Sequence, residues 1–212
     1  MKRRLNILCL LVVLVLGYSV LEAAYYMGEG FMAGVAMTQD NESLDRAKNM
    51  KAISVLPADF SDFTDSVYNE KTGTYVPALY GQLLISVPVK TSPAALIAVS
   101  LVQILGIAAS VVGVILFVKL IVSINRSLIF SWRNVRRLRW LGVALIFHYL
   151  CMLVPLLVAG REVNEVFALR GYELHQSDLV SVITLVLAIV SFIVAEVFAI
   201  GLKMKEEQDL TI

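Results

Sequence analysis

The stretch AALIAVSLVQILGIAASVVGVILFV, residues 94–118, decides the fold, because it contains no acidic and no basic residue. A bilayer core about 30 Å thick is crossed by roughly 20 helical residues. Residues 5–21, 140–159 and 179–195 form three further runs of this kind. The sequence therefore predicts an all-α integral membrane protein with four transmembrane helices.

The composition agrees with this prediction. Hydrophobic residues make up 58% of the chain and charged residues 17%, whereas soluble domains average about 45–50% and about 25%. The net charge of +1 hides an uneven distribution. Nine acidic and five basic residues occur within 22–90, whereas the link between the second and third runs contains bases and no acid.

The positive-inside rule assigns links rich in Lys and Arg to the cytoplasm. It predicts a membrane protein with both termini in the cytoplasm. The predicted parts are a first transmembrane helix with its basic N-terminus (1–24), an extracytoplasmic subdomain (25–92), a second helix (93–125), an Arg-rich cytoplasmic link (126–139), a third helix (140–159), an outer loop (160–178), a fourth helix (179–200) and a cytoplasmic tail (201–212). A cleaved signal peptide is an alternative for the first run. Glu22 argues against it, because it disturbs the small-residue pattern of a cleavage site.

The segment between the first two helices predicts a small α+β insertion. Residues 41–51 are polar and favour a short helix, and Lys71-Thr72-Gly73 indicates a turn. Residues 75–78 and 82–89 favour strands, the second by its alternating apolar residues. Pro77 and Pro88 predict edge positions for both, because proline cannot donate to a strand ladder.

Capping residues indicate where three helices begin. Ser92 and Pro93 suit the start of the second helix, Ser131 the start of the third, and Ser177 with Asp178 the start of the fourth. The first helix is expected to loosen at Gly28, Gly30 and Gly34.

Small residues predict packing faces. In the fourth helix they recur at three- and four-residue steps, which lets membrane helices approach closely; they are Ser181, Thr184, Ala188, Ser191 and Ala195. This face is expected to pack against another helix of the same molecule or in a homodimer.

Three polar residues in or near the apolar runs are candidates for intramembrane function: Gln103, His148 and Glu196. For His148 a hydrogen bond from a neutral imidazole to Gln103 or to a backbone carbonyl is favoured over a functional role. For Glu196 an ion pair with Lys119 or with an arginine of the cytoplasmic link is favoured.

The sequence contains none of the common catalytic or metal-binding signatures, so we expect no enzymatic activity, no cofactor and no metal. Cys9 and Cys151 lie in apolar runs and are expected to be small buried residues.

The Arg-rich link is the strongest candidate interaction surface. Arg133, Arg136 and Arg137 are spaced to project from one side of a helix. We expect them to bind a protein partner together with the acidic residues of the tail, which are Glu206, Glu207 and Asp209. Simple pairing of the tail with the arginines, or attraction of anionic lipid, is the alternative. Direct binding of nucleic acid is not expected beside a membrane that is itself anionic.

Two segments resemble a known family. One is Phe-Val-Lys-Leu-Ile-Val-Ser-Ile-Asn-Arg-Ser (117–127), and the other is Glu-Gln-Asp-Leu-Thr-Ile (207–212). Both are similar to bacterial membrane proteins grouped as domain of unknown function 2975, over about residues 94–212. The resemblance implies a four-helix membrane protein whose gene often neighbours a Cro/CI-type helix-turn-helix transcription regulator, and it implies no catalytic residues.

These observations favour a non-enzymatic protein that senses the envelope and acts on that regulator. A small transporter, or an accessory subunit of one, is the alternative, which a polar path through the membrane would favour.

Overall fold

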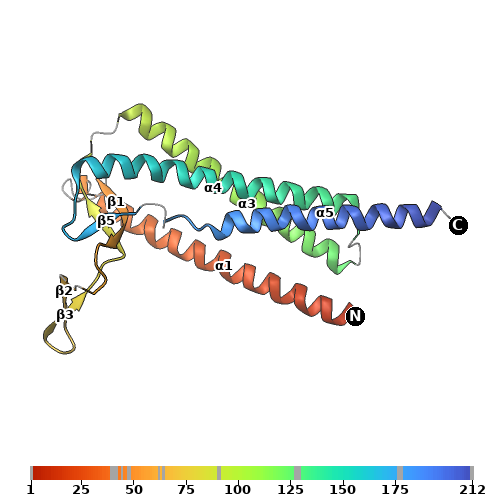
Figure 1. Cartoon of the computed structure of the whole chain (residues 1–212), viewed down its shortest axis with the longest axis horizontal. Coiled ribbons are helices and arrows are strands. Elements are labelled where there is room, and N and C mark those ends of the chain that lie inside the picture. The colour runs from red at the N-terminus through yellow and green to blue at the C-terminus, as the bar shows by residue number, and fades with distance from the viewer. Residues whose placement is uncertain are drawn as a thin grey trace. The chain divides into compact units, whose positions relative to one another are not determined.

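The computed structural model describes residues 2–38, 43, 45–46, 49–61, 63, 65–89, 92–126, 130–175 and 179–210, and their side chains between residues 6 and 209. Its four long helices are α1 (Lys2–Met37), α3 (Pro93–Asn125), α4 (Trp132–Val166) and α5 (Ile183–Leu210) (Figure 1). Each is long and apolar enough to cross a membrane, which confirms the four predicted spans and makes this a multi-pass membrane protein.

The chain divides into two compact units. Unit 1 comprises residues 1–33, 101–152 and 181–212, and it is helical. Unit 2 comprises residues 34–100 and 153–180 and contains all five strands.

The two described helix caps occur as predicted. The Ser92 hydroxyl accepts a hydrogen bond from the Ala95 amide at 3.2 Å, and α3 begins at Pro93. The Ser131 hydroxyl accepts one from the Asn134 amide at 3.4 Å, one residue before α4 begins. Both hydroxyls satisfy amides that lack a partner within the helix.

Four helix ends differ from the prediction, and one of them is the end of α5, which continues to Leu210 instead of ending at residue 200. Helix α1 continues through its glycines to Met37, and α4 continues past residue 159, across Pro155, to Val166. A helix keeps its own backbone hydrogen bonds outside the bilayer, so the limits of an apolar run do not mark its ends. Helix α5 begins at Ile183 rather than at 179, and the predicted caps Ser177 and Asp178 lie outside the described residues.

The small-residue face of α5 is covered within this chain. Ala188 and Ala195 are 0% exposed, and the buried Ser191 hydroxyl donates to the Leu138 carbonyl of α4 at 2.8 Å. Ser181 and Thr184, nearer the start of α5, are not buried. The predicted packing face is therefore confirmed from Ala188 onward.

Unit 2 contains two small antiparallel sheets. The strands are β1 (Met50–Pro57), β2 (Asp65–Asn69), β3 (Thr74–Ala78), β4 (Gln82–Ser86) and β5 (Tyr172–Leu174). One sheet has the order β4-β1-β5, and the other is the hairpin β2-β3. The hairpin turns at the predicted place, where Gly73 adopts a φ of 66° and its amide donates to the Asn69 carbonyl. That left-handed conformation favours glycine.

Strand β1 forms the core of unit 2 with the end of α4. Ile53, Val55 and Val163 are at most 3% exposed and form one cluster. An ion pair of 3.9 Å joins Lys51 of β1 to Glu162 of α4. The strand β5 pairs with β1, although it comes from the link between α4 and α5.

The predicted insertion is thus confirmed as a β region between α1 and α3, with corrections. The edge positions of β3 and β4 are confirmed, but β4 ends at Ser86, before Pro88. Of the expected helix over 41–51, residues 43, 45 and 46 are helical, whereas residues 50 and 51 begin β1 instead. Residues 41, 42, 44, 47 and 48 lie outside the described residues. Strands β1, β2 and β5 were not predicted.

Candidate functional site

The start of α4 lies against α3 and α5 in a close-packed part of unit 1. The buried residues there form one hydrophobic cluster, to which α3 contributes Leu120, α4 contributes Val135 and Leu138, and α5 contributes Ala195, Ala199 and Leu202. Beside it, the rings of Phe130 and Phe198 lie 5.4 Å apart. Burial of apolar surface in this cluster stabilises the association of the three helices where they leave the apolar spans.

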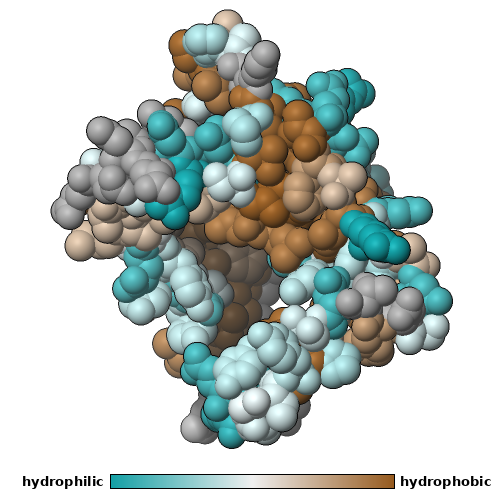
Figure 2. Space-filling model, turned by 90° about the vertical axis from the view of Figure 1, so that its left-hand side faces the viewer, coloured by the Kyte–Doolittle hydropathy of each residue, from teal (hydrophilic) through white to brown (hydrophobic). Residues whose placement is uncertain are grey.

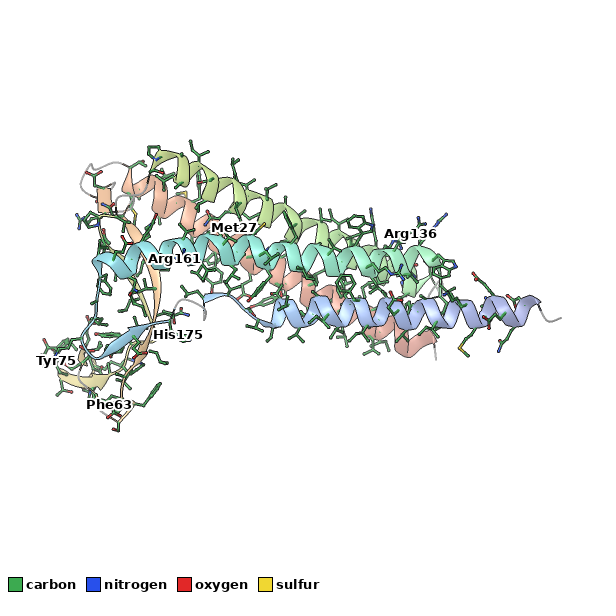
Figure 3. All side chains as sticks on the ribbon, turned by 45° about the horizontal axis from the view of Figure 1, so that its top comes forward. Met27, Phe63, Tyr75, Arg136, Arg161 and His175 are labelled. Carbon is green, nitrogen blue, oxygen red and sulfur yellow. The ribbon has the colours of Figure 1, made fainter. Side chains whose placement is uncertain are left out.

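The helical period separates the apolar and basic residues of α4 here. Val135 is 0% exposed, whereas Arg133 and Arg136 are exposed to solvent. Arg136 lies in the first turns of α4 (Figure 3). The predicted basic side of this helix is therefore present, and it lies next to a groove.

The groove has a volume of about 740 Å³. Bases from α3, from the residue after it and from α4 line it, and no acidic residue does; these bases are Lys119, Arg126, Arg133, Arg136 and Arg137. Within the described parts of the chain, Arg126, Arg133 and Arg136 form no ion pair. Concentrated positive charge of this kind attracts anions, and guanidinium groups bind carboxylates or phosphates in a bidentate manner.

Arg137 differs from the other arginines of the groove, because its side chain is held in place. Its Nη1 donates to the Lys119 carbonyl at 3.2 Å and to Asn134 Oδ1 at 3.1 Å. Asn134 is itself 0% exposed. Arg137 therefore links α3 to α4 and fixes one wall of the groove.

The acidic end of α5 reaches this groove. Trp132 lines the groove, and its Nε1 donates to Glu206 Oε1 at 2.9 Å. Glu207 and Asp209 follow in the same helix and are exposed. The predicted arginines and the predicted acidic tail therefore meet at Trp132. Trp132 was not among the predicted site residues, although an aromatic ring beside arginines is common in binding surfaces.

The candidate intramembrane residues do not form one site. His148 Nδ1 lies 2.9 Å from the Gly106 carbonyl oxygen, so the partner is a backbone carbonyl and not Gln103. Glu196 is paired with Arg139, with 2.8 Å between Nη2 and Oε1, so an arginine of the link is its partner rather than Lys119. Gln103 is exposed on α3.

The thiols are placed as expected. Cys9 and Cys151 are 7% and 6% exposed, and both are free. In the part of the chain that the structure describes, no three His, Cys, Asp or Glu side chains gather as a metal-binding group.

Comparison with known proteins identifies the family. The model of the family described as "Protein of unknown function (DUF2975)" matches residues 60–212, so the match begins before the expected residue 94 and takes in β2, β3 and β4. No curated protein and no solved structure matches the chain. The match covers the groove, the acidic end of α5 and most of the chain, and the protein therefore belongs to the DUF2975 family.

Proposed function

We propose that this protein is a non-enzymatic regulator in the bacterial cytoplasmic membrane, which binds an acidic cytoplasmic protein in its basic groove. The observation that carries the proposal is the groove itself, with five bases in its lining and no acid. By its family, the expected partner is a Cro/CI-type transcription regulator.

The charge distribution supports a cytoplasmic position for the groove. Short links rich in Lys and Arg stay in the cytoplasm, and the link that carries Arg126 and Arg133 is of this kind. Both termini then face the cytoplasm, and residues 25–92 and 160–178 face outward.

The properties of the bases favour a protein partner. Arg133 and Arg136 are exposed on one side of α4 and are available to carboxylates. The contact between Trp132 and Glu206 places a carboxylate of this chain at the groove already. One hydrogen bond to a charged group contributes about 1.5–3 kcal/mol, so a partner with several carboxylates can displace it.

Unit 2 supplies a surface on which an external signal can act. Its exposed side chains include several large apolar ones, among them Phe60, Phe63, Tyr68, Tyr75 and Leu84. Figure 2 views the protein from the side on which Figure 1 draws the strands. Hydrophobic residues (brown) lie among hydrophilic ones (teal) in this view. Exposed apolar groups of this kind suit recognition of an envelope component.

A transporter, or an accessory subunit of one, remains the alternative, and the polar residues favour the regulator over it. His148 is bonded to the Gly106 carbonyl and Glu196 to Arg139. A coupling path needs these groups to exchange protons or ions with one another. Their partners are separate, so no path through the described residues joins these two groups.

Charge reversal in the groove tests the proposal. The double variant Arg133→Glu, Arg136→Glu reverses two bases of the groove, and Arg161→Glu, Arg170→Glu reverses two exposed arginines of unit 2 as a matched control. Each protein is solubilised from membranes and purified by its tag, and the regulator encoded next to its gene is quantified in the eluate.

We expect the groove variant to insert normally, and the amount of regulator that co-purifies with it to fall at least tenfold. The control should co-purify as much regulator as the parent. Transcription of the operon should change with the groove variant alone. If co-purification and transcription are the same in both variants and the parent, the regulatory proposal is wrong and the transporter alternative replaces it.

A further inference from the structure

A second cavity, open over part of its surface, lies within unit 1 and is apolar. Its volume is about 410 Å³, and all four helices line it, for example with Leu16 of α1, Phe117 of α3, Leu145 of α4 and Val194 of α5. Small-molecule sites in proteins measure about 300–1,000 Å³, are mostly apolar and contain a few placed polar groups. The cavity has this size and this character.

The polar group that distinguishes this cavity is His148, near the middle of α4. Its Nδ1 lies 2.9 Å from the Gly106 carbonyl oxygen. A carbonyl can only accept, so Nδ1 carries the hydrogen, and in a neutral imidazole Nε2 is then an acceptor. Among the described residues, Nε2 has no hydrogen-bond partner.

Helices α3 and α4 pack closely beside this ring. A side chain at Gly106 would come within 2.9 Å of Cys151 Cβ, so α3 and α4 are in close contact where the imidazole meets the carbonyl. An acceptor without a hydrogen bond in an apolar medium costs free energy. The imidazole therefore favours a ligand that can donate a hydrogen bond over one that cannot.

The cavity offers little to complete the hydrogen bonding of Nε2. Two serine hydroxyls also line it. That of Ser191 donates to the Leu138 carbonyl at 2.8 Å, so its hydrogen is already in use, and among the described residues no hydrogen bond joins the Ser110 hydroxyl to the imidazole. A bound water needs two to four polar partners, and apart from His148 and the two serines the side chains of this lining are apolar. A lipid acyl chain fits the apolar walls but has no donor.

We propose that the cavity binds a lipid-soluble molecule with an apolar body and one hydroxyl group, such as a long-chain alcohol, whose hydroxyl donates to His148 Nε2. The apolar body would occupy the space between Phe117, Leu145 and Val194. This site is separate from the basic groove, and the proposal does not depend on the regulatory function.

The test uses two photoreactive probes, a diazirine-bearing dodecanol and its methyl ether, with the purified full-length protein in nanodiscs. The ether keeps the apolar body and removes the donor. One hydrogen bond changes affinity roughly three- to tenfold. We expect the alcohol to label peptides of the cavity lining at several-fold lower concentration than the ether, and unlabelled dodecanol to compete.

Three variants extend the test. Leu145→Trp fills the cavity and should abolish labelling, whereas Leu150→Trp adds the same ring at an exposed position of α4 and should not. His148→Phe should remove the preference for the alcohol over the ether. Equal labelling of the parent by both probes, or full labelling of Leu145→Trp, would overturn the proposal. The comparison of the two probes on the parent protein needs no variant, so it holds even if a variant fails to fold.

Discussion

At the residue scale, two glycines of the helices illustrate how much local sequence leaves open. Gly106 lies within the apolar run 94–118, whereas Gly28 follows the first run and was expected to loosen its helix. In the structure, Gly106 is buried against α4, whereas nothing lies within 4 Å of a Cβ placed on Gly28. The difference depends on the neighbouring helix, which no local pattern specifies.

Replacing each glycine by alanine tests this distinction. In Gly106→Ala the new Cβ would meet Cys151 Cβ at 2.9 Å and Met152 Cε at 2.7 Å. The Met152 end can move, but the Cys151 Cβ cannot, so we expect a loss of about 1–3 kcal/mol of stability from overpacking. Thermal unfolding in detergent measures it.

Gly28→Ala is the control for this substitution. Alanine favours a helix over glycine by up to about 1 kcal/mol, and no neighbour opposes it. Its melting temperature should equal or exceed that of the parent. If both variants melt alike, α3 and α4 are not in contact at Gly106.

At the scale of the element, α5 shows that a sequence pattern can identify a packing face in a membrane helix. Burial begins at Ala188 and recurs at Ser191, Ala195 and Ala199, which follows the helical period. The capping residues of α3 and α4 could also be predicted from the sequence, because a hydroxyl one or two residues before a helix accepts a hydrogen bond from a nearby amide. The packing partner of α5 could not be predicted, because a face of small residues can pack equally well against α4 or against a second copy of the chain.

Enlarging the buried face of α5 should weaken the protein. Ala188→Leu and Ala195→Leu each add three carbon atoms where the alanine is 0% exposed, and overpacking of this kind costs about 1–3 kcal/mol. Val197→Leu changes an exposed position of the same helix and is the control. The stability of the three variants and the parent is compared by their resistance to detergent and by their melting curves in detergent. Unchanged melting of the alanine variants would mean that this face contacts lipid.

At the scale of the whole molecule, unit 2 is assembled from segments far apart in the chain. Its β1 pairs with β4 from the same insertion and with β5 from the link between α4 and α5. The last turns of α4 add Val163 to its core. A small α+β insertion has little core of its own, and this arrangement supplies the missing apolar contacts.

An engineered disulfide tests the pairing of β1 with β5. Leu56 and Glu173 lie directly opposite each other, and facing residues of antiparallel strands have Cα atoms about 4.5–5.5 Å apart, within the range that a disulfide spans. In a background with Cys9→Ala and Cys151→Ala, we expect Leu56→Cys with Glu173→Cys to resist maleimide labelling until it is reduced.

The matched control places the second cysteine in a strand that is not adjacent. Leu84→Cys with Glu173→Cys places one cysteine in β4 and one in β5. These strands lie on opposite sides of β1, about 10 Å apart, so no disulfide should form and both thiols should react with maleimide. Oxidation of the purified protein tests the pairing by itself. Spontaneous oxidation in cells tests the outward position of unit 2, because disulfides form outside the cytoplasm. Equal labelling of both pairs after oxidation of the purified protein would contradict the sheet.

The sequence by itself determined the four membrane-spanning helices, two of their caps, the small-residue face of α5 and the basic side of α4. These features depend on apolar length, on local hydrogen bonds and on helical period, which act over a few residues. Tertiary structure alone decided that β5 joins the sheet, that Trp132 connects the groove to Glu206, and that His148 meets Gly106 beside a cavity. Each of these contacts joins residues that are far apart in the chain, and the geometry that brings them together arises only when the helices and strands pack.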